Sequence, residues 1–377
     1  MPTRLLAAST ILCCVAAPTV GQVPDSARLQ HALDSLHAEG LLIGATAAIT
    51  LADGGVLALA AGQSDTARGA PMRPDHRMLA GSVGKMFFGA LALQLVDDGR
   101  LDLDAPVSRW LGTEPWFDSL PNARTVTVRQ LMQHTSGLVR YELNPAFLAD
   151  LQAQPFRTFT PVEELRYLFG AAPPFPAGEG WDYSDTNYIV LAMILERILG
   201  IPAYRAIHDG VITPLGLTGT IPSDRPDLPG LAQGYAGPRN PFGPFDAVLV
   251  DGRFALNPQF EWAGGGYAST SSDLARLAKA WYEGVLFDTT LVAEATRGVP
   301  APMLGPNVQY GLTTIVRQTP LGATWGHSGF FPGYLTEVRY YPTHRMAVAV
   351  QLNQNAPRIG PGRVAQILAE RLATGQR

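Results

Sequence analysis

The spacing of apolar residues changes along the chain and separates stretches that predict helices from stretches that predict strands. Residues 25–40 (DSARLQHALDSLHAEG) place leucines three or four positions apart between a polar start and a glycine, which predicts an amphipathic helix. Residues 44–62 (GATAAITLADGGVLALAAG) predict two short strands joined by a turn at Asp53-Gly54. The chain therefore begins with a helix followed by a hairpin.

The middle of the chain, from Ser82 to about Phe260, is predicted to be mostly helical. One apolar helix follows Ser82 and ends near Gly99, and the run TNYIVLAMILERILG predicts a second. The stretches GAAPPFPAGEG and GPRNPFGPFD are rich in proline and glycine and predict loops. After a glycine-rich bend and a capped helix from about Ser271 come four strand-like runs, LTTIVRQ, ATWGHSG, LTEVRYYP and MAVAVQLN, and a closing helix, RVAQILAERLA.

This order of elements predicts an α+β fold. Strands at both ends of the chain can form one antiparallel sheet flanked by helices, with the all-α region inserted between them. With 377 residues, 46% of them hydrophobic and 16% charged, the chain can bury a sizeable core and is not disordered. Its net charge of −4 includes no basic patch, which argues against nucleic acid as a partner.

The first residues have the pattern of a secretory signal. Arg4 supplies a positive start, the apolar stretch 5–17 is too short to span a bilayer comfortably, and small residues follow, so we expect cleavage between Ala17 and Gln22. Both cysteines, Cys13 and Cys14, would leave with this segment. The mature protein would then have no disulfide, no catalytic thiol and no cysteine-bound zinc. It is expected to be exported, to the periplasm or beyond, with no stable membrane span.

One serine and one lysine form the first candidate for chemistry. Lysine occurs only at Lys85 and Lys279, and Lys85 lies three residues after Ser82, where both face the same side of a helix start. Free backbone N–H groups and the helix dipole favour developing negative charge there. To act as a base near pH 7, the amine needs its pKa lowered by about three units, or ~4 kcal/mol, which burial among apolar neighbours can supply.

The same serine allows a second interpretation. AGSVG (residues 80–84) matches a relaxed nucleophile elbow of an α/β-hydrolase. Such an elbow requires a buried strand directly before it, and the preceding stretch PMRPDHRMLA contains two prolines and several charges. The elbow is therefore disfavoured.

Two later stretches add candidate groups. Tyr183, in GWDYSDTNY, precedes an apolar helix, and a phenol near an ammonium group can approach the phenolate form and shuttle protons. His327, in WGHSGFFPGY, lies on a strand-like run with a small hydroxyl and a glycine, which suits the edge of a substrate cleft. Taken alone, a residue of either kind is more often an ordinary packing or hydrogen-bonding residue.

Together the three stretches resemble the serine hydrolases of the penicillin-recognising superfamily, in the branch with class C β-lactamases, D-alanyl-D-alanine carboxypeptidases and related esterases. That family has Ser-x-x-Lys, then Tyr-x-Asn, then a Lys- or His-x-Gly strand, and this chain has Ser82 to Lys85, Tyr183 to Asp185 and His327 to Gly329. LDLDAPVSRWL, LMQHTSGL, GGGYASTSSDLARL and YGL resemble the family too. The resemblance covers nearly the whole mature chain.

The resemblance implies a role for each residue. Ser82 is the acylated nucleophile, and Lys85 and Tyr183 share the general acid and base work. The backbone N–H groups of Ser82 and Phe330 form the oxyanion hole. The resemblance further implies that His327 hydrogen-bonds near Tyr183 or binds a substrate carboxylate, that Gly329 and Asp185 face the substrate, and that HTSG at residues 134–137 is a structural loop in which Ser136 is not a second nucleophile.

Three positions depart from the family pattern. Asp185 stands where asparagine is common, and an ionised carboxylate can only accept hydrogen bonds and would favour the charged form of Lys85. His327 replaces the lysine typical of class C β-lactamases, and the bulk of Phe330 narrows the acyl-side pocket. We therefore expect β-lactam hydrolysis to be inefficient.

The expected organisation is a signal peptide (1–22) and one β-lactamase-like domain (23–377), with an α/β part (23–81 and 263–377) and a mostly helical part (82–262). The expected activity is cleavage of an amide or ester through a Ser82 acyl-enzyme, first on D-alanyl peptides such as those of the cell wall, then on small esters, then on β-lactams. A penicillin-binding module without turnover and an α/β-hydrolase are the alternatives. No metal or organic cofactor is implied, since no histidines show ligand spacing.

Overall fold

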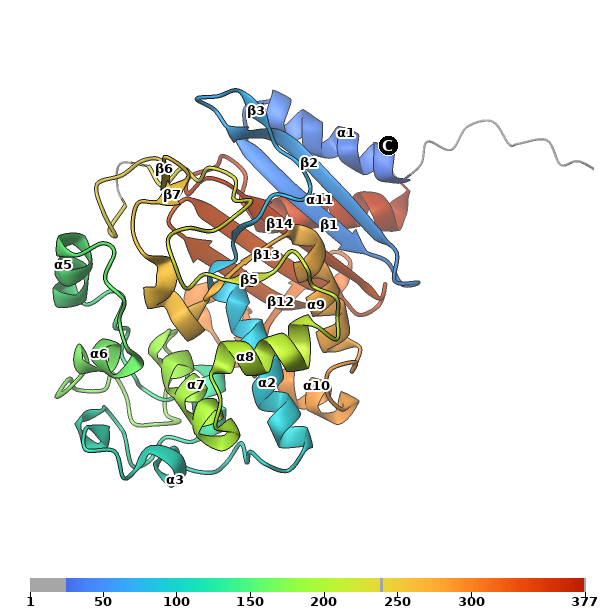
Figure 1. The fold of residues 1–377 in the computed structure, drawn as a ribbon. Coiled ribbons are helices and arrows are strands. Elements are labelled where there is room, and N and C mark those ends of the chain that lie inside the picture. Colours follow the sequence, from blue (N-terminus) through green and yellow to red (C-terminus); the bar gives the residue numbers. More distant parts are fainter. Residues whose placement is uncertain (1–24, 238–239, 376–377) are drawn as a thin grey trace, which may run out of the picture.

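The computed structural model describes residues 25–237 and 240–375. The expected signal peptide, residues 1–22, lies outside the described residues. Figure 1 shows a large sheet with helices on both of its faces and a helical region beside it. In the part of the chain that is described, no helix is both long and apolar enough to cross a membrane.

The main sheet has nine strands, and they come from both ends of the chain. Each neighbouring pair is antiparallel. Their order across the sheet is β3 (Ala70–Pro71), β2 (Val56–Asp65), β1 (Gly44–Thr50), β14 (Met346–Leu352), β13 (Tyr334–Tyr341), β12 (Gly322–Phe331), β11 (Ile315–Thr319), β10 (Gln309–Tyr310) and β9 (Val299–Pro300).

The centre of the sheet joins the first strand to the last. In the register of β1 and β14, Ala48 lies opposite Ala349, and every residue of both strands is buried. Larger aliphatic side chains, such as Val348 and Val350, pack against α1 (Asp25–Ala38) and α11 (Pro361–Thr374) on one face. The alternate alanines face α9 (Ser271–Tyr282) on the other, and both strands are in contact with this helix. Strands covered on both faces read as continuous apolar runs, which explains the sequence MAVAVQL.

The helical region between β4 and β8 surrounds one largely apolar helix, α2 (Lys85–Asp97). Its first nine residues are all buried, so this helix runs through the middle of the molecule. The other α-helices are α3 (Ser108–Leu111), α4 (Val128–Gln133), α5 (Pro145–Ala153), α6 (Pro161–Arg166), α7 (Thr186–Leu199), α8 (Ala203–Ile207) and α10 (Thr289–Ala295).

Short elements complete the described chain. Four are tight 3₁₀ helices, η1 (Gly81–Gly84), η2 (Phe117–Ser119), η4 (Pro258–Gly264) and η5 (Pro302–Leu304), and η3 (His208–Ile212) is a wider π-helical turn. A second sheet has the order β4 (Met78–Leu79), β8 (Tyr267–Ser269), β5 (Ile221–Pro222), and β6 (Leu249–Val250) pairs with β7 (Arg253–Phe254).

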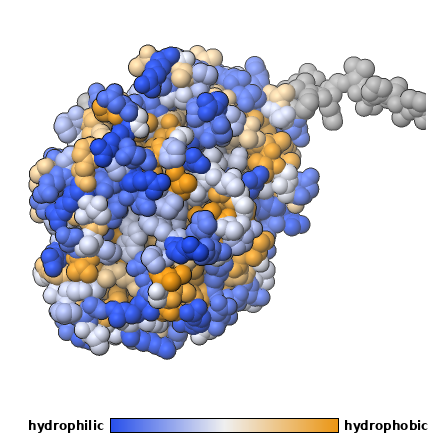
Figure 2. Space-filling model, in the orientation of Figure 1, coloured by the Kyte–Doolittle hydropathy of each residue, from blue (hydrophilic) through white to orange (hydrophobic). Residues whose placement is uncertain are grey.

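The α+β fold predicted from the sequence is confirmed. The predicted hairpin corresponds to β1 and β2, and the four late runs correspond to β11 to β14. The short strands β3 to β10 were not anticipated, because two-residue strands leave no periodic signal. The face seen in Figure 2 is mostly polar, with apolar side chains in small separate patches.

Candidate active site

Ser82 and Lys85 lie where a tight turn passes into the buried helix. Ser82 belongs to η1 and Lys85 is the first residue of α2. The Lys85 Nζ donates a hydrogen bond of 3.0 Å to the Ser82 Oγ. Ser82 is partly exposed, whereas the Lys85 side chain is completely buried. The hydroxyl is therefore open to a substrate while its neighbouring amine is shielded from water.

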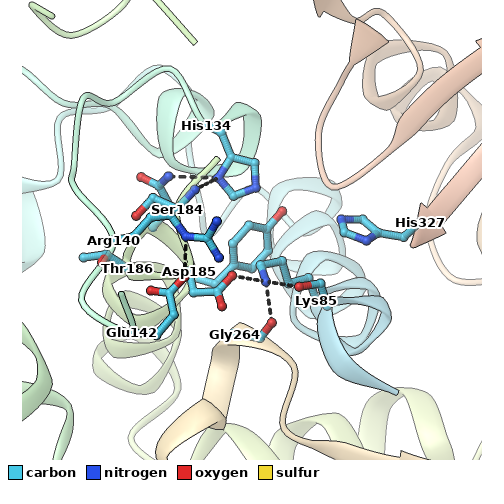
Figure 3. A network of polar contacts seen from close by, with 12 residues as sticks. Lys85, His134, Arg140, Glu142, Ser184, Asp185, Thr186, Gly264 and His327 are labelled. Atoms are coloured by element: carbon cyan, nitrogen blue, oxygen red, sulfur yellow. Dashed lines mark hydrogen bonds and ion pairs between the residues drawn. The ribbon is translucent and has the colours of Figure 1, made fainter. Parts of the chain in front are cut away.

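Lys85 is held by a carboxylate and a carbonyl. Its Nζ lies 2.5 Å from the Asp185 Oδ1 and also donates to the Gly264 carbonyl oxygen (Figure 3). Burial by itself would lower the pKa of Lys85, but the Asp185 carboxylate and, to a smaller extent, Tyr183 together outweigh burial and raise it above the ordinary lysine value. The sequence-based expectation of a neutral amine is therefore wrong for the resting enzyme. Its reason is the aspartate in place of the family's asparagine.

Tyr183 lies beside this pair. The Lys85 Nζ is 5.0 Å from the centre of its ring. The Tyr183 hydroxyl is buried and, within the described part of the chain, no hydrogen-bond partner meets it with good geometry. Burial raises the pKa of Tyr183 and the Lys85 charge only partly offsets the rise. The side chain is a neutral phenol, so the expected approach to a phenolate is wrong for the resting state.

His327 belongs to a chain of hydrogen bonds between rings. Its Nε2 accepts a 2.8 Å bond from the Tyr310 hydroxyl, and its Nδ1 donates a 2.7 Å bond to the Ser328 carbonyl oxygen. At the other end, the His134 Nε2 lies 3.2 Å from the same Tyr310 oxygen and donates to it. This direction follows because the His134 Nδ1 accepts bonds from the Ser184 backbone N–H and the Asn187 side chain.

His327 is therefore a neutral, fixed imidazole. Burial and the nearby Lys85 charge lower its pKa to about 3. Its ring centre lies 6.2 Å from that of Tyr183, and its ring nitrogens bond to Tyr310 and Ser328 instead. The expected hydrogen bond toward Tyr183 is absent among the described contacts, and an uncharged imidazole is a poor partner for a carboxylate. Ser136 is also engaged: its Oγ donates to the Asn187 side chain at 2.5 Å, away from the cavity.

Glycines bring the backbone of β12 against η1, the turn that contains Ser82 (the serine turn). A Cβ placed on Gly81 would lie 2.6 Å from the Phe330 nitrogen, and one on Gly329 would lie 2.0 Å from the Ala80 carbonyl oxygen. No side chain fits at either contact. The backbone of Phe330 thus lies against Gly81, the residue directly before Ser82.

A strained segment closes the other side of the site. In η4, Trp262 has φ 29 and ψ −109, an unusual conformation for a bulky residue. This bend directs the Gly264 carbonyl to Lys85 and lets Gly265 meet the serine turn, since a Cβ on Gly84 would lie 1.5 Å from the Gly265 oxygen.

Ser82 opens into a cavity of about 580 Å³. Its lining includes every residue of the predicted site except Lys85, which lies beneath the floor. Phe330 is 45% exposed at the mouth and, as expected, occupies part of the entrance. The apolar lining residues are Leu143, Pro241, Phe242, Phe260, Met303, Leu304, Ile315, Phe330, Phe331, Pro332, Leu335 and Pro361. Across the part of the chain that is described, no group of histidine, cysteine or acidic residues could hold a metal ion.

Three acidic residues were missed by the sequence analysis. Glu142, Glu261 and Glu337 also line the cavity, and Arg140 pairs with Glu142 through a bond of 2.6 Å (Figure 3). Single glutamates outside a motif give no signal in one sequence. His134 and Tyr310 lay in stretches already noted for their resemblance, HTSG and YGL, but the hydrogen bonds that connect them to His327 follow only from the fold.

Comparisons with known proteins agree with this geometry. A family model described as Beta-lactamase matches residues 29–370. Esterase EstB of Burkholderia gladioli is 30% identical over 341 residues, which are 81% of this chain and 83% of the esterase. Penicillin-binding protein 4* of Bacillus subtilis is 26% identical over 298 residues, covering 75% of this chain and 62% of that protein.

Among solved structures, a D-stereospecific amidohydrolase from Streptomyces sp. has a TM-score of 0.78 and 29% identity, covering 94% of this chain and 100% of that one. The family expected from the three motifs is thus confirmed, and with it an enzyme that acts on an amide or ester. The chain belongs to the β-lactamase family of serine hydrolases.

Proposed function

We propose that the protein hydrolyses esters or amides through an acyl-enzyme formed on Ser82. The observation that supports this most directly is the 3.0 Å contact between the Ser82 Oγ and the buried Lys85 Nζ at the floor of the cavity. In acylation the Ser82 Oγ bonds to the substrate carbonyl carbon, and its proton passes to Lys85 in its neutral form. The backbone N–H groups of Ser82 and Phe330 stabilise the oxyanion.

The neutral form of Lys85 can arise within the ion pair. Asp185 lies 2.5 Å away and can accept the lysine proton, which leaves an uncharged amine without moving charge to solvent. Tyr183, as a neutral phenol, is in the form needed to donate a proton to the leaving alcohol or amine. Lys85 then returns the serine proton to Tyr183. In deacylation a water molecule attacks the carbonyl carbon of the ester on Ser82, and Lys85 and Tyr183 accept the proton of the water. They return a proton to the Ser82 Oγ as its bond to the acyl carbon breaks.

The substrate is proposed to be a small or medium ester or amide with an apolar group. The support is the largely aromatic and aliphatic lining of the cavity and the similarity to an esterase. A D-alanyl peptide, the first expectation from the sequence, is the second candidate, supported by the similarity to a D-stereospecific amidohydrolase and to a penicillin-binding protein. A neutral His327 gives a terminal carboxylate little attraction, so esters rank first.

β-Lactams rank last, because Asp185 and His327 replace the residues typical of β-lactamases. Export through the signal at residues 1–22 is likewise proposed, from the sequence pattern. The single domain of residues 23–377, with its α/β and helical parts, remains a proposal of the same kind.

The test compares variants of the only two lysines. We expect Ser82→Ala and Lys85→Ala each to lower turnover of p-nitrophenyl acetate at least a hundredfold, and Lys279→Ala, which pairs with Glu283 outside the cavity lining, to leave it within twofold. Retained activity in Lys85→Ala would point to an α/β-hydrolase elbow instead.

Two further experiments separate the remaining alternatives. A fluorophosphonate or fluorescent penicillin adduct that persists without ester turnover would indicate a binding module. A panel of esters, D-Ala-D-Ala peptide and nitrocefin ranks the substrates.

A further inference from the structure

The ionisable residues that line the cavity are unequally divided between acids and bases. Four are acidic, Glu142, Asp185, Glu261 and Glu337, and the only lysine or arginine among them is Arg140. Arg140 is already paired with Glu142, and Asp185 with the buried Lys85. Glu337 is paired with Arg339 at 2.7 Å. Glu261 alone has no ion-pair partner among the described residues, so the cavity holds an acid with no cation.

Two of these acids also have a carboxyl oxygen without a hydrogen-bond partner among the described residues. Glu142 and Glu261 are 5% and 6% exposed, and in each the Oε2 has no hydrogen-bond partner within the described chain. Buried polar atoms are normally satisfied, and an exception in a cavity wall marks a place where a ligand can supply the missing donor. An ammonium group has three N–H donors and a positive charge, and can therefore supply both the missing hydrogen-bond donor and the missing positive charge.

Glu261 is close enough to the nucleophile to act on a bound substrate. A Cβ on Gly265 would lie 2.1 Å from the Glu261 Oε1 and 2.7 Å from the Gly81 carbonyl oxygen. The Glu261 carboxyl group and the carbonyl of Gly81, the residue before Ser82, therefore border the same small space next to Gly265. The strained Trp262 directly after Glu261 fixes this placement.

We propose that Glu261, together with Glu142 in the lining of the same cavity, forms a subsite for a protonated amine, so that the preferred substrates are esters or amides carrying a free ammonium group next to an apolar group. The apolar part contacts the aromatic wall formed by Phe242, Phe260 and Phe331. A metal ion is not the ligand, since no three side chains of the described part are grouped to bind one. The proposal rests on the proposed function, of which it names the substrate class.

The surroundings of Glu261 favour its uncharged form. Burial and the Asp185 charge raise the pKa of Glu261 to about 8, while Lys85 opposes the rise and Glu142 adds to it. A bound ammonium group replaces this proton and releases it to solvent. Binding of the cation therefore tightens as the pH rises from 6.5 to 8.5, provided that the amine itself stays protonated.

The experiment measures binding to the Ser82→Ala variant by calorimetry, so that it does not depend on turnover. 2-Phenylethylamine is compared with 2-phenylethanol, which has the same apolar part without the charge. At pH 8 we expect the amine to bind at least tenfold more tightly. In Ser82→Ala/Glu261→Gln this preference falls below threefold, whereas Ser82→Ala/Glu179→Gln, which removes an exposed acid, keeps it.

Equal affinity for the amine and the alcohol in Ser82→Ala overturns the proposal, even if the glutamine variant fails to fold. A preference that survives Glu261→Gln in a variant with normal thermal unfolding also overturns it. The proposed function fails by a different result, the retention of p-nitrophenyl acetate turnover in Ser82→Ala. The two failures are therefore distinguishable.

Discussion

Asp185 is the residue that sets the charge state of the candidate base. With asparagine at this position, burial would act on Lys85 without an opposing carboxylate and its pKa would fall. With aspartate, the amine is charged at rest and must give up its proton before it can accept another. Lys85, the candidate base, and the Asp185 carboxylate thus form a buried ion pair.

Replacing this carboxylate tests the ion pair. In Asp185→Asn the pKa of Lys85 falls, and because only the neutral amine accepts the serine proton, the rise of kcat/KM with pH moves to lower pH. We expect activity on amides at pH 7 to be kept or increased, measured as a pH profile from 5 to 10 for the parent and the variant. A loss of more than tenfold across the profile would contradict this and assign the carboxylate a required role in proton transfer.

At the scale of single residues, the sequence predicts contacts between residues that are close together in the chain. Ser82 and Lys85 are three residues apart, so a helical turn is enough to bring them together. Tyr183 and His327 could be placed only through the resemblance. The network of His134, Tyr310 and His327 joins residues nearly two hundred positions apart. No local rule predicts such contacts, and the unpaired carboxyl of Glu261 was equally invisible.

At the scale of elements, the site is built where three backbone segments touch. The turn η1, the strand β12 and the bend after η4 approach so closely that Gly81, Gly84 and Gly329 leave no room for a side chain. The sequence predicted the helix after Ser82 and the strand around His327. It did not predict that they meet, because the contact depends on how the sheet and the helical region are assembled. The glycine run 264–266 allows this close backbone packing.

Gly84→Ala tests this three-way contact. Its Cβ would lie 1.5 Å from the Gly265 oxygen, so the bend must move and take the Gly264 carbonyl away from Lys85. We expect the free energy of unfolding to fall by about 2–4 kcal/mol, since backbone atoms cannot give way as side chains do. The measurement is urea denaturation together with p-nitrophenyl acetate turnover, which should fall with it.

The matched control is Gly360→Ala at the start of α11. There a Cβ has no neighbour within 4 Å and φ is −76, so the change is limited to the helix cap and costs about 1 kcal/mol or less. Equal stability of the two variants would mean that the bend is free to move, and that the close approach is not needed to hold Lys85.

At the scale of the whole molecule, the order of predicted elements was sufficient for the fold class. An antiparallel sheet that uses both ends of the chain leaves the central segment to form a separate helical layer. The cavity forms where these two parts meet, and its lining comes from both. This position explains why so many ionisable groups are buried: both surfaces contribute polar side chains that assembly then removes from water.

Those buried groups make stability depend on pH in a defined direction. Glu261 has a folded-state pKa of about 8 against an ordinary value of 4.5, so its contribution is complete below pH 4.5 and is lost as the pH rises to 8. Burial lowers the pKa values of His134 and His327. The fold is therefore destabilised at the acidic end of the range, as the pH falls below 6.5. The protein should therefore be most stable in mildly acidic solution.

We expect the thermal unfolding midpoint to fall between pH 6.5 and 8.5, because each carboxyl held protonated in the fold costs about 1.4 kcal/mol per pH unit until its folded-state pKa is reached. Glu261→Gln cannot ionise and should flatten this fall, whereas Glu39→Gln, on the exposed end of α1, should retain it. Calorimetry of the three proteins across this range provides the comparison. If the unfolding midpoint of Glu261→Gln falls as steeply with pH as that of the parent, the Glu261 carboxyl is already ionised in the folded protein. The cavity wall then carries this negative charge before any ligand binds.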